Sequence, residues 1–151
     1  MTRRLSSRFD SADVSPGLLL WRATNRWQAM IRAALAPYEL THVQFVLLAS
    51  LTWSDADGDL TQIELARQSG VDPMMASQVL RALEGKGLVR RRADPGDRRA
   101  IRVTPTAEGV ALVNAANDAV EGVDDAFFGA TGQLTGTLVE HLQRLGSIEA
   151  R

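Results

Sequence analysis

The sequence contains no cysteine and only two histidines. Without cysteine, the chain can form neither a disulfide bond nor a thiolate metal site, and nothing in it argues for an oxidising compartment. The two histidines, His42 and His141, have no Asp or Glu at metal-ligand spacing on a common helix face. We therefore expect a protein that binds no metal and uses no cofactor.

Long apolar runs are also absent. Residues 1–8 carry the positive charges of a signal peptide but lack its apolar centre, and no later run is long enough to cross a membrane. We therefore expect a cytoplasmic protein without a membrane partner. The 151 residues are 45% apolar, which is enough for one domain with a hydrophobic core.

No group of side chains typical of an active site stands out. The sequence shows no nucleophile paired with a base, no glycine-rich phosphate loop and no cluster of metal ligands. We therefore expect that the protein is not an enzyme.

The net charge is -1, but the charge is distributed unevenly. Between Arg81 and Arg102 there are eight basic residues against three acidic ones, whereas residues 105–150 contain one Arg and seven acids. A polyanion responds to such a local patch more than to the total charge. Residues 81–102 are therefore the candidate surface for binding the phosphates of a nucleic acid.

Helix-start signals occur at four places. Each consists of a Ser, Thr or Asp N-cap followed by Pro at the first helical position, or by Gln or Glu at the third. They lie at Ser15-Pro16, Thr41-Gln44, Thr61-Glu64 and Asp72-Pro73. Gly70 can adopt the left-handed conformation that ends a helix. These signals predict helices over residues 16–36, 42–53, 62–69 and 73–86.

The helix predicted over residues 73–86 has two different faces. Its apolar stripe consists of Ala76, Val79, Leu80 and Leu83, and its exposed stripe of Met74, Ser77, Gln78 and Arg81. Together with the preceding helix and a three-residue turn, this pattern is typical of a helix-turn-helix, whose second helix contacts base edges and phosphates. The alternative interpretation is that these are two ordinary short amphipathic helices joined at a glycine.

A basic hairpin follows this helix. The pattern predicts strands over residues 88–92 and 98–103, joined by a turn at 94–97. The negative potential of a narrow minor groove favours an inserted arginine at such a tip. The DNA contacts that we expect from this hairpin are those of Arg90, Arg92, Arg98 and Arg99. A solvated surface hairpin is the alternative.

The remaining C-terminal residues are predicted to be helical. Thr104-Pro105 is expected to cap a helix that ends near Gly129. A last amphipathic helix then carries the apolar residues Leu134, Leu138, Leu142 and Leu145. Residues 1–14 lack periodicity and are expected to form a flexible arm. The predicted fold class is mainly α with a small β-wing.

These elements and their residues resemble the MarR family of winged helix-turn-helix transcription regulators. The most specific stretch runs from Asp72 to Gly109 and includes residues 83–91, LEGKGLVRR, and 94–100, DPGDRRA. The resemblance implies that Asp97 supports the wing tip and that Arg99 enters the minor groove. It also implies that the helices in 15–36 and 105–151 interlock with a second copy, leaving 37–104 as the DNA-binding lobe.

The resemblance further implies that a small aromatic ligand binds between the dimerisation helices and the lobe. Trp27, Met30, His42 and Phe45 are the expected lining residues, and core packing is the alternative for them. Two positions depart from the family pattern: Gln78 replaces a basic residue found in many relatives, and Met74-Met75 opens a helix that usually begins with polar residues. We expect Met75 to pack in the core.

The sequence therefore predicts a homodimeric, sequence-specific regulator of transcription that binds double-stranded DNA. Repressors are the commoner kind in the family. A homodimer with a two-fold axis implies a pseudo-palindromic operator, and the resemblance implies release by the aromatic ligand. The alternative is a non-specific architectural DNA-binding protein. Such a protein spreads its basic residues over the surface, whereas here they cluster.

Overall fold

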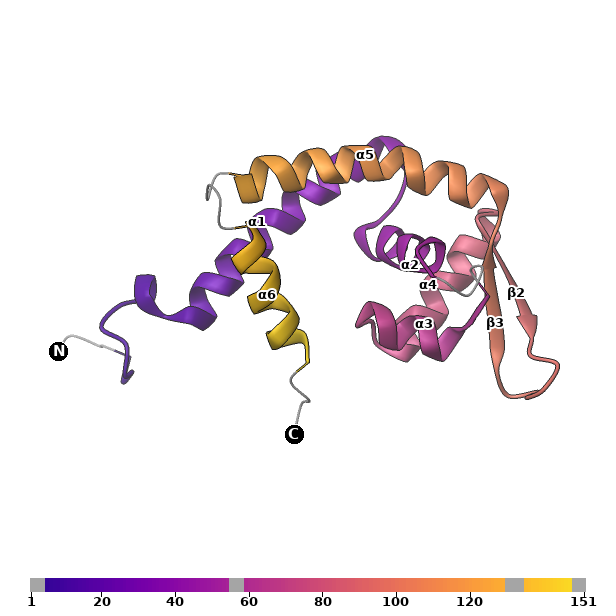
Figure 1. Cartoon of the computed structure of the whole chain (residues 1–151), viewed down its shortest axis with the longest axis horizontal. Coiled ribbons are helices and arrows are strands. Elements are labelled where there is room, and N and C mark those ends of the chain that lie inside the picture. The colour runs from indigo at the N-terminus through magenta and orange to yellow at the C-terminus, as the bar shows by residue number, and fades with distance from the viewer. Residues whose placement is uncertain (1–4, 55–58, 130–134, 148–151) are drawn as a thin grey trace.

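The computed structural model describes residues 5–54, 59–129 and 135–147 (Figure 1). The helices are η1 (Ala12–Val14), α1 (Pro16–Leu35), η2 (Ala36–Tyr38), α2 (His42–Thr52), α3 (Gln62–Ser69), α4 (Pro73–Gly85), α5 (Ala107–Gly129) and α6 (Thr135–Gly146). The strands are β1 (Leu60–Thr61), β2 (Val89–Ala93) and β3 (Ile101–Pro105), in the sheet order β1-β3-β2. The mainly α fold with a small β-wing is thereby confirmed.

Helices α2, α3 and α4 form a lobe with the sheet at its edge, and the two long helices α1 and α5 pack together and extend away from it (Figure 1). Residues 1–4 of the expected arm and the predicted position of Leu134 lie outside the described residues. Among the helices that the structure describes, none is both long and apolar enough to cross a membrane.

The predicted capping boxes set the starts of α2 and α3. The Thr41 hydroxyl accepts a hydrogen bond from the Gln44 N–H at 3.2 Å, and the Gln44 side chain accepts one from the Thr41 N–H at 3.1 Å. Thr61 and Glu64 repeat the arrangement. Bonds donated by the hydroxyl and N–H of Thr61 lower the pKa of Glu64. Ser15, by contrast, makes no side-chain capping bond at the start of α1.

The core of the lobe is built around α2. Leu47, Leu48 and Leu51 are fully buried, and α2 packs against α3 and α4 as well as against α1 and α5. The predicted apolar stripe of α4 contacts this core through Ala76, Leu80 and Leu83, which are also fully buried. Close packing of this kind restricts movement of α4 relative to the lobe.

The strands of the hairpin differ from the prediction in where they begin and end. The return strand begins at Ile101, because residues 98–100 belong to the turn, where the Ala100 N–H donates to the Asp97 carbonyl at 2.9 Å. Thr104-Pro105 does not cap α5, since Pro105 still pairs with Val89 in the sheet. Thr106 is the cap: its hydroxyl accepts from the Gly109 N–H at 3.0 Å.

The position of Gly109 in α5 requires glycine. A Cβ at this position would overlap the carbonyl oxygen of Leu88. Because backbone cannot easily move away, we expect Gly109→Ala to lower the free energy of unfolding by about 1–3 kcal/mol. Gly122 in the same helix has no atom within 4 Å of an added Cβ, so Gly122→Ala is expected to raise it by about 0.5–1 kcal/mol. Urea unfolding of both variants measures these free energies. Equal changes in the two variants would contradict the close contact between Gly109 and the Leu88 carbonyl.

Candidate nucleic-acid interface

The face of α4 that points away from the core is the first part of the candidate site. Met74 is 77% exposed, Gln78 and Arg81 are exposed, and Ser77 is half-buried. Arg81 Nη2 donates to Ser77 Oγ at 3.1 Å, one helical turn away. Asp72 caps the helix by accepting from the N–H groups of Met74 and Met75. A short row of hydrogen-bonding side chains thus lies on a helix whose other face is held in the core.

Met75 does not pack as the sequence predicts. It is 51% exposed, and the expectation that it lies in the core is wrong. The first turn of α4 extends beyond the packed part of the lobe, and Ala76 is its first buried residue. The exposed face of α4 therefore begins with two neighbouring methionines.

The wing tip is organised by two aspartates. The Asp94 carboxylate accepts from the N–H groups of Gly96 at 2.7 Å and Asp97 at 3.2 Å, and from Arg102 Nε at 2.5 Å. Asp97 in turn accepts from the Arg99 N–H at 2.9 Å. The carboxylates hold the turn from inside, so its backbone has a defined shape on which Arg98 and Arg99 are exposed.

The arginines of the basic segment divide into two groups. Arg92 pairs with Asp59 at 2.7 Å, Arg91 with Glu84 at 3.4 Å, and Arg102 with Asp94 and Asp59. Among the described residues, the other arginines of this segment form no ion pair, namely Arg81 on α4 and Arg90, Arg98 and Arg99 in the hairpin. The first group braces the wing against the lobe, and the second has its charge available for a polyanion.

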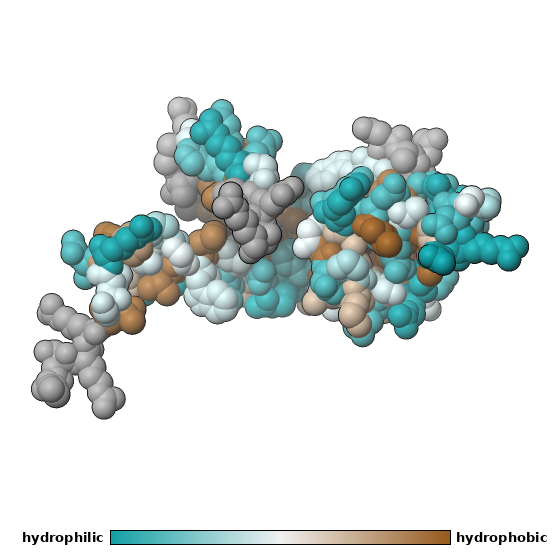
Figure 2. All heavy atoms as spheres, turned by 90° about the horizontal axis from the view of Figure 1, so that it is seen from below, coloured by the Kyte–Doolittle hydropathy of each residue, from teal (hydrophilic) through white to brown (hydrophobic). Residues whose placement is uncertain are grey.

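The lobe carries these features on its surface. Seen from below, it is largely hydrophilic, and a hydrophilic projection marks the edge where Figure 1 places the wing (Figure 2). β2 packs directly against α4, and Arg91 Nη2 in β2 donates to Gln62 Oε1 in α3 at 3.2 Å. The helix face and the wing are therefore parts of one packed unit.

The bracing role of Asp94 leads to a mutational prediction. Asp94→Asn removes the charge that pairs with Arg102 and weakens the bonds that shape the tip. We expect affinity for DNA to fall by about threefold to tenfold, within the range of about 0.5–3 kcal/mol for coupled networks. Fluorescence anisotropy with labelled DNA measures this. The control is Asp118→Asn, which also removes one negative charge, at an exposed position of α5, and should leave the affinity for DNA unchanged. An equal loss of affinity in both variants would contradict the role of Asp94 in holding the wing tip.

Asp94 should also titrate abnormally. The N–H of Gly96, followed by the Arg102 side chain, lowers the pKa of Asp94 below its ordinary value of 3.8. Because the pKa is lower in the folded state, this carboxylate stabilises the wing above pH 3.8 and loses that effect as pH falls through the folded pKa. A side-chain NMR titration should give a midpoint below 3.8 for Asp94. A midpoint at or above that value would contradict the bonding described.

The residues expected to line a ligand pocket are only partly brought together. The rings of Trp27 and His42 meet edge to face at 5.2 Å, and Trp27 Nε1 donates to Asp124 Oδ1 at 2.7 Å. Burial, followed by the charge of Arg32, lowers the pKa of His42. Phe45 lies in the core and is only 7% exposed. Met30 is half-buried on α1.

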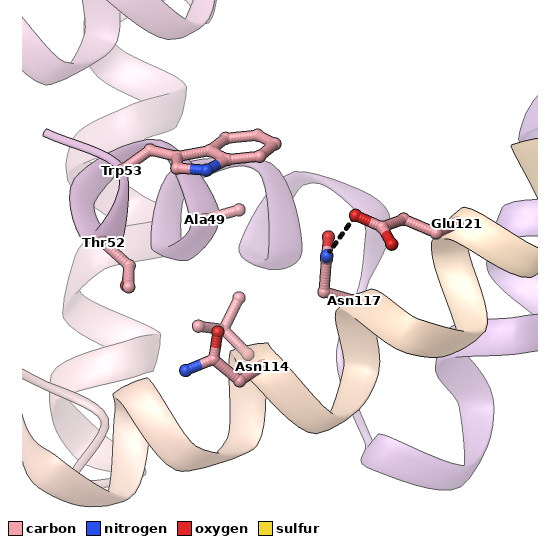
Figure 3. A pocket seen from close by; sticks show the side chains of 7 residues that line it. Ala49, Thr52, Trp53, Asn114, Asn117 and Glu121 are labelled. Atoms are coloured by element: carbon pink, nitrogen blue, oxygen red, sulfur yellow. Dashed lines mark hydrogen bonds between the residues drawn. The ribbon is translucent and has the colours of Figure 1, made fainter.

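A cavity of about 150 Å³ lies between α2 and α5 (Figure 3). Its lining residues are Ala49, Thr52, Trp53, Val113, Asn114, Asn117 and Glu121. Sequence analysis did not single out these polar residues of α5. The only signal was their spacing on one helical stripe beside the apolar one.

A helix-turn-helix with an exposed polar face, followed by a β-hairpin with unpaired arginines at its tip, defines a winged-helix DNA-binding protein. The comparisons with known proteins agree. The MarR family model matches residues 40–101. An uncharacterised helix-turn-helix transcriptional regulator of Bacillus subtilis is 46% identical over 125 residues, which cover 82% of this chain and 85% of that protein. The chain belongs to the MarR family of transcription regulators.

Two further relatives have more specific descriptions. A helix-turn-helix transcriptional repressor of Mycobacterium bovis is 39% identical over 114 residues, covering 75% of this chain and 80% of that protein. The solved structure of Bordetella bronchiseptica BpsR superimposes with a TM-score of 0.82 at 26% identity, covering 91% of this chain and 96% of that one. DNA binding by BpsR is regulated by 6-hydroxynicotinic acid.

Proposed function

We propose that this protein is a homodimeric repressor that acts in the cytoplasm on a pseudo-palindromic operator and is released by a small ligand. One observation carries the proposal: the exposed polar face of α4 and the unpaired arginines of the wing tip belong to the same packed lobe. A rigid unit can present both to one duplex at once, so that neither contact requires the backbone to reorganise.

Each side chain then has a distinct role at the DNA. In the major groove, Gln78 pairs with adenine, Arg81 with guanine, and Ser77 with either bases or phosphate. Met74 contacts a thymine methyl group. Arg99 enters the adjacent minor groove, where its charge is favoured. Phosphates are contacted by Arg90 and Arg98, which form no ion pair among the described residues, and by Arg92, whose side chain stays half exposed beside Asp59.

The dimer is supported by apolar side chains that the single chain leaves uncovered. On α1, Leu18 and Leu19 are each 43% exposed and Trp21 is 69% exposed. On α6, Leu142 and Leu145 are 46% and 56% exposed. Exposed apolar side chains concentrated on two helices favour an interface, and a two-fold axis would make it self-complementary. The same axis would set the two copies of α4 about one DNA turn apart, roughly 34 Å.

Repression and ligand release are supported by the relatives. The Mycobacterium bovis protein is a repressor, and 6-hydroxynicotinic acid regulates the DNA binding of BpsR. In this chain, a ligand that prefers one arrangement of α5 relative to the lobe would shift the population between spacings of α4 that match the operator and spacings that do not.

Selection of bound sites from random DNA, using the full chain, tests the proposal. We expect an enriched pseudo-palindrome whose half-site centres are about 10 base pairs apart. The same complex should dissociate steeply with added salt, because phosphate contacts release counterions. Binding of equal strength to every sequence would instead support the non-specific architectural protein.

A further inference from the structure

The cavity between α2 and α5 is lined by groups that suit a particular kind of ligand. It combines one aromatic ring, two amides and one carboxylate, and none of the described residues lining it is Lys, Arg or His. Trp53 is 78% exposed at the end of α2, and its indole lies across from Asn117 and Glu121 of α5 (Figure 3). An indole left this uncovered next to a hollow has apolar area that a ligand can bury.

The polar groups of the cavity are positioned on one stripe of α5. Asn117 Nδ2 donates to Glu121 Oε1 at 2.8 Å, which orients the carboxylate and leaves Oε2 available. Within the described residues, the Asn114 side chain has no hydrogen-bond partner in the protein. Glu121 is therefore a charged acceptor oriented by its neighbour, and none of the lining residues that the structure describes is a cation that would compensate its charge.

We propose that this cavity binds a small planar cation, such as an amidine or protonated amine carried on a single ring. The cationic group would donate to Glu121 Oε2, and charge-assisted bonds of this type are among the strongest available to a ligand. The ring would lie against Trp53, whose π face also attracts positive charge. An aromatic acid of the same shape would meet the Glu121 carboxylate and is rejected by like charge.

The size of the cavity agrees with a single ring. Its volume is about 150 Å³. An apolar cavity of about that volume in another protein accommodates benzene. The preferred ligand is thus a monocyclic cation rather than a larger one.

Occupation of the cavity would act on the DNA-binding lobe through α2. This helix packs against α5 on one side and against α3 and α4 on the other. A ligand wedged between α2 and α5 would change their separation and so turn α4 relative to the dimerisation helices. This last step rests on the proposed function, whereas binding of the cation does not.

Calorimetric titration of the full chain with benzamidine and with benzoate tests the inference, because these two ligands share a ring and differ in charge. We expect benzamidine to bind at least about tenfold more tightly than benzoate, a difference of about 1.4 kcal/mol. Glu121→Gln should remove that preference, and Trp53→Leu should weaken both ligands. Asp118→Asn removes the same charge from an exposed α5 position outside the lining and should change nothing.

Equal binding of the two ligands, tighter binding of benzoate, or an unaltered preference in Glu121→Gln would overturn the assigned chemistry. Operator affinity, measured without ligand, tests the proposed function separately. If the operator binds but saturating benzamidine leaves its affinity unchanged, the regulatory step is wrong while the site stands. If no sequence is preferred while benzamidine binds through Glu121, the proposed function fails and the site again stands.

Discussion

A chain carrying both Leu142→Glu and Leu145→Glu is expected to be a folded monomer that binds operator about 100-fold more weakly or worse. Both side chains are about half exposed in the single chain, at 46% and 56%, so charging them leaves the core of the lobe intact. Buried between two copies, the same charges would be unpaired and costly. Joining two DNA-binding lobes multiplies affinity by about 10²–10⁴ through effective concentration, and a monomer loses that gain.

Sedimentation and anisotropy should be measured on the same samples. Gln143→Glu adds negative charge at an exposed position of the same helix and serves as the control, which should remain dimeric and bind normally. A monomer that still binds the operator tightly would show that α6 is not part of the functional interface.

Arg99→Ala is expected to reduce operator affinity at least about tenfold while the fold and the dimer remain intact. The Arg99 side chain is exposed and forms no ion pair among the described residues, so its removal costs the free protein little. In the complex, it supplies the positive charge that a narrow minor groove favours. Its backbone N–H remains bonded to Asp97 in the variant, so the tip keeps its shape.

Two further variants separate the causes of that loss. Arg99→Lys retains the charge but not the planar guanidinium, and should recover only part of the affinity. Arg22→Ala removes a positive charge on α1 that pairs with Asp13 at 2.8 Å, and should have little effect. Unchanged affinity in Arg99→Ala would refute the assignment of the wing.

Local signals predicted most of the helices. The boxes at Thr41 and Thr61 act over three residues, and α2 and α3 start where they predict. Gly70 ends α3 with φ of 65°, the left-handed conformation that glycine adopts without strain. Such features depend on neighbours in sequence, so a single sequence contains the information needed to find them.

The errors in the wing arise from pairing at a distance. β1 has only two residues and exists because Leu60 and Thr61 pair with Val103 and Arg102 far along the chain. The pairing of β2 with β3, which keeps Thr104 and Pro105 in the sheet, explains why Thr106 rather than Thr104 caps α5. The ion pairs of Asp59 with Arg92 and Arg102 join residues more than thirty positions apart, and no local sequence pattern indicates them.

The candidate site was predictable where one helix carries it and not where two helices meet. The exposed stripe of α4 follows from helical spacing, although the exposure of Met75 depends on where the core ends. The cavity between α2 and α5 brings Trp53 beside Asn117 and Glu121, more than sixty positions later. Only packing reveals such a site.

The central claim is that the face of α4 and the wing contact one duplex together. Hydroxyl-radical footprinting of the selected operator, with the wild-type chain and with Arg99→Ala, measures this directly at the level of single nucleotides. In each half-site, the wild type should protect the backbone beside the major groove and, next to it, the minor groove. Arg99→Ala should lose only the minor-groove protection. A wild-type footprint confined to one groove, or an identical footprint for the variant, would contradict the claim.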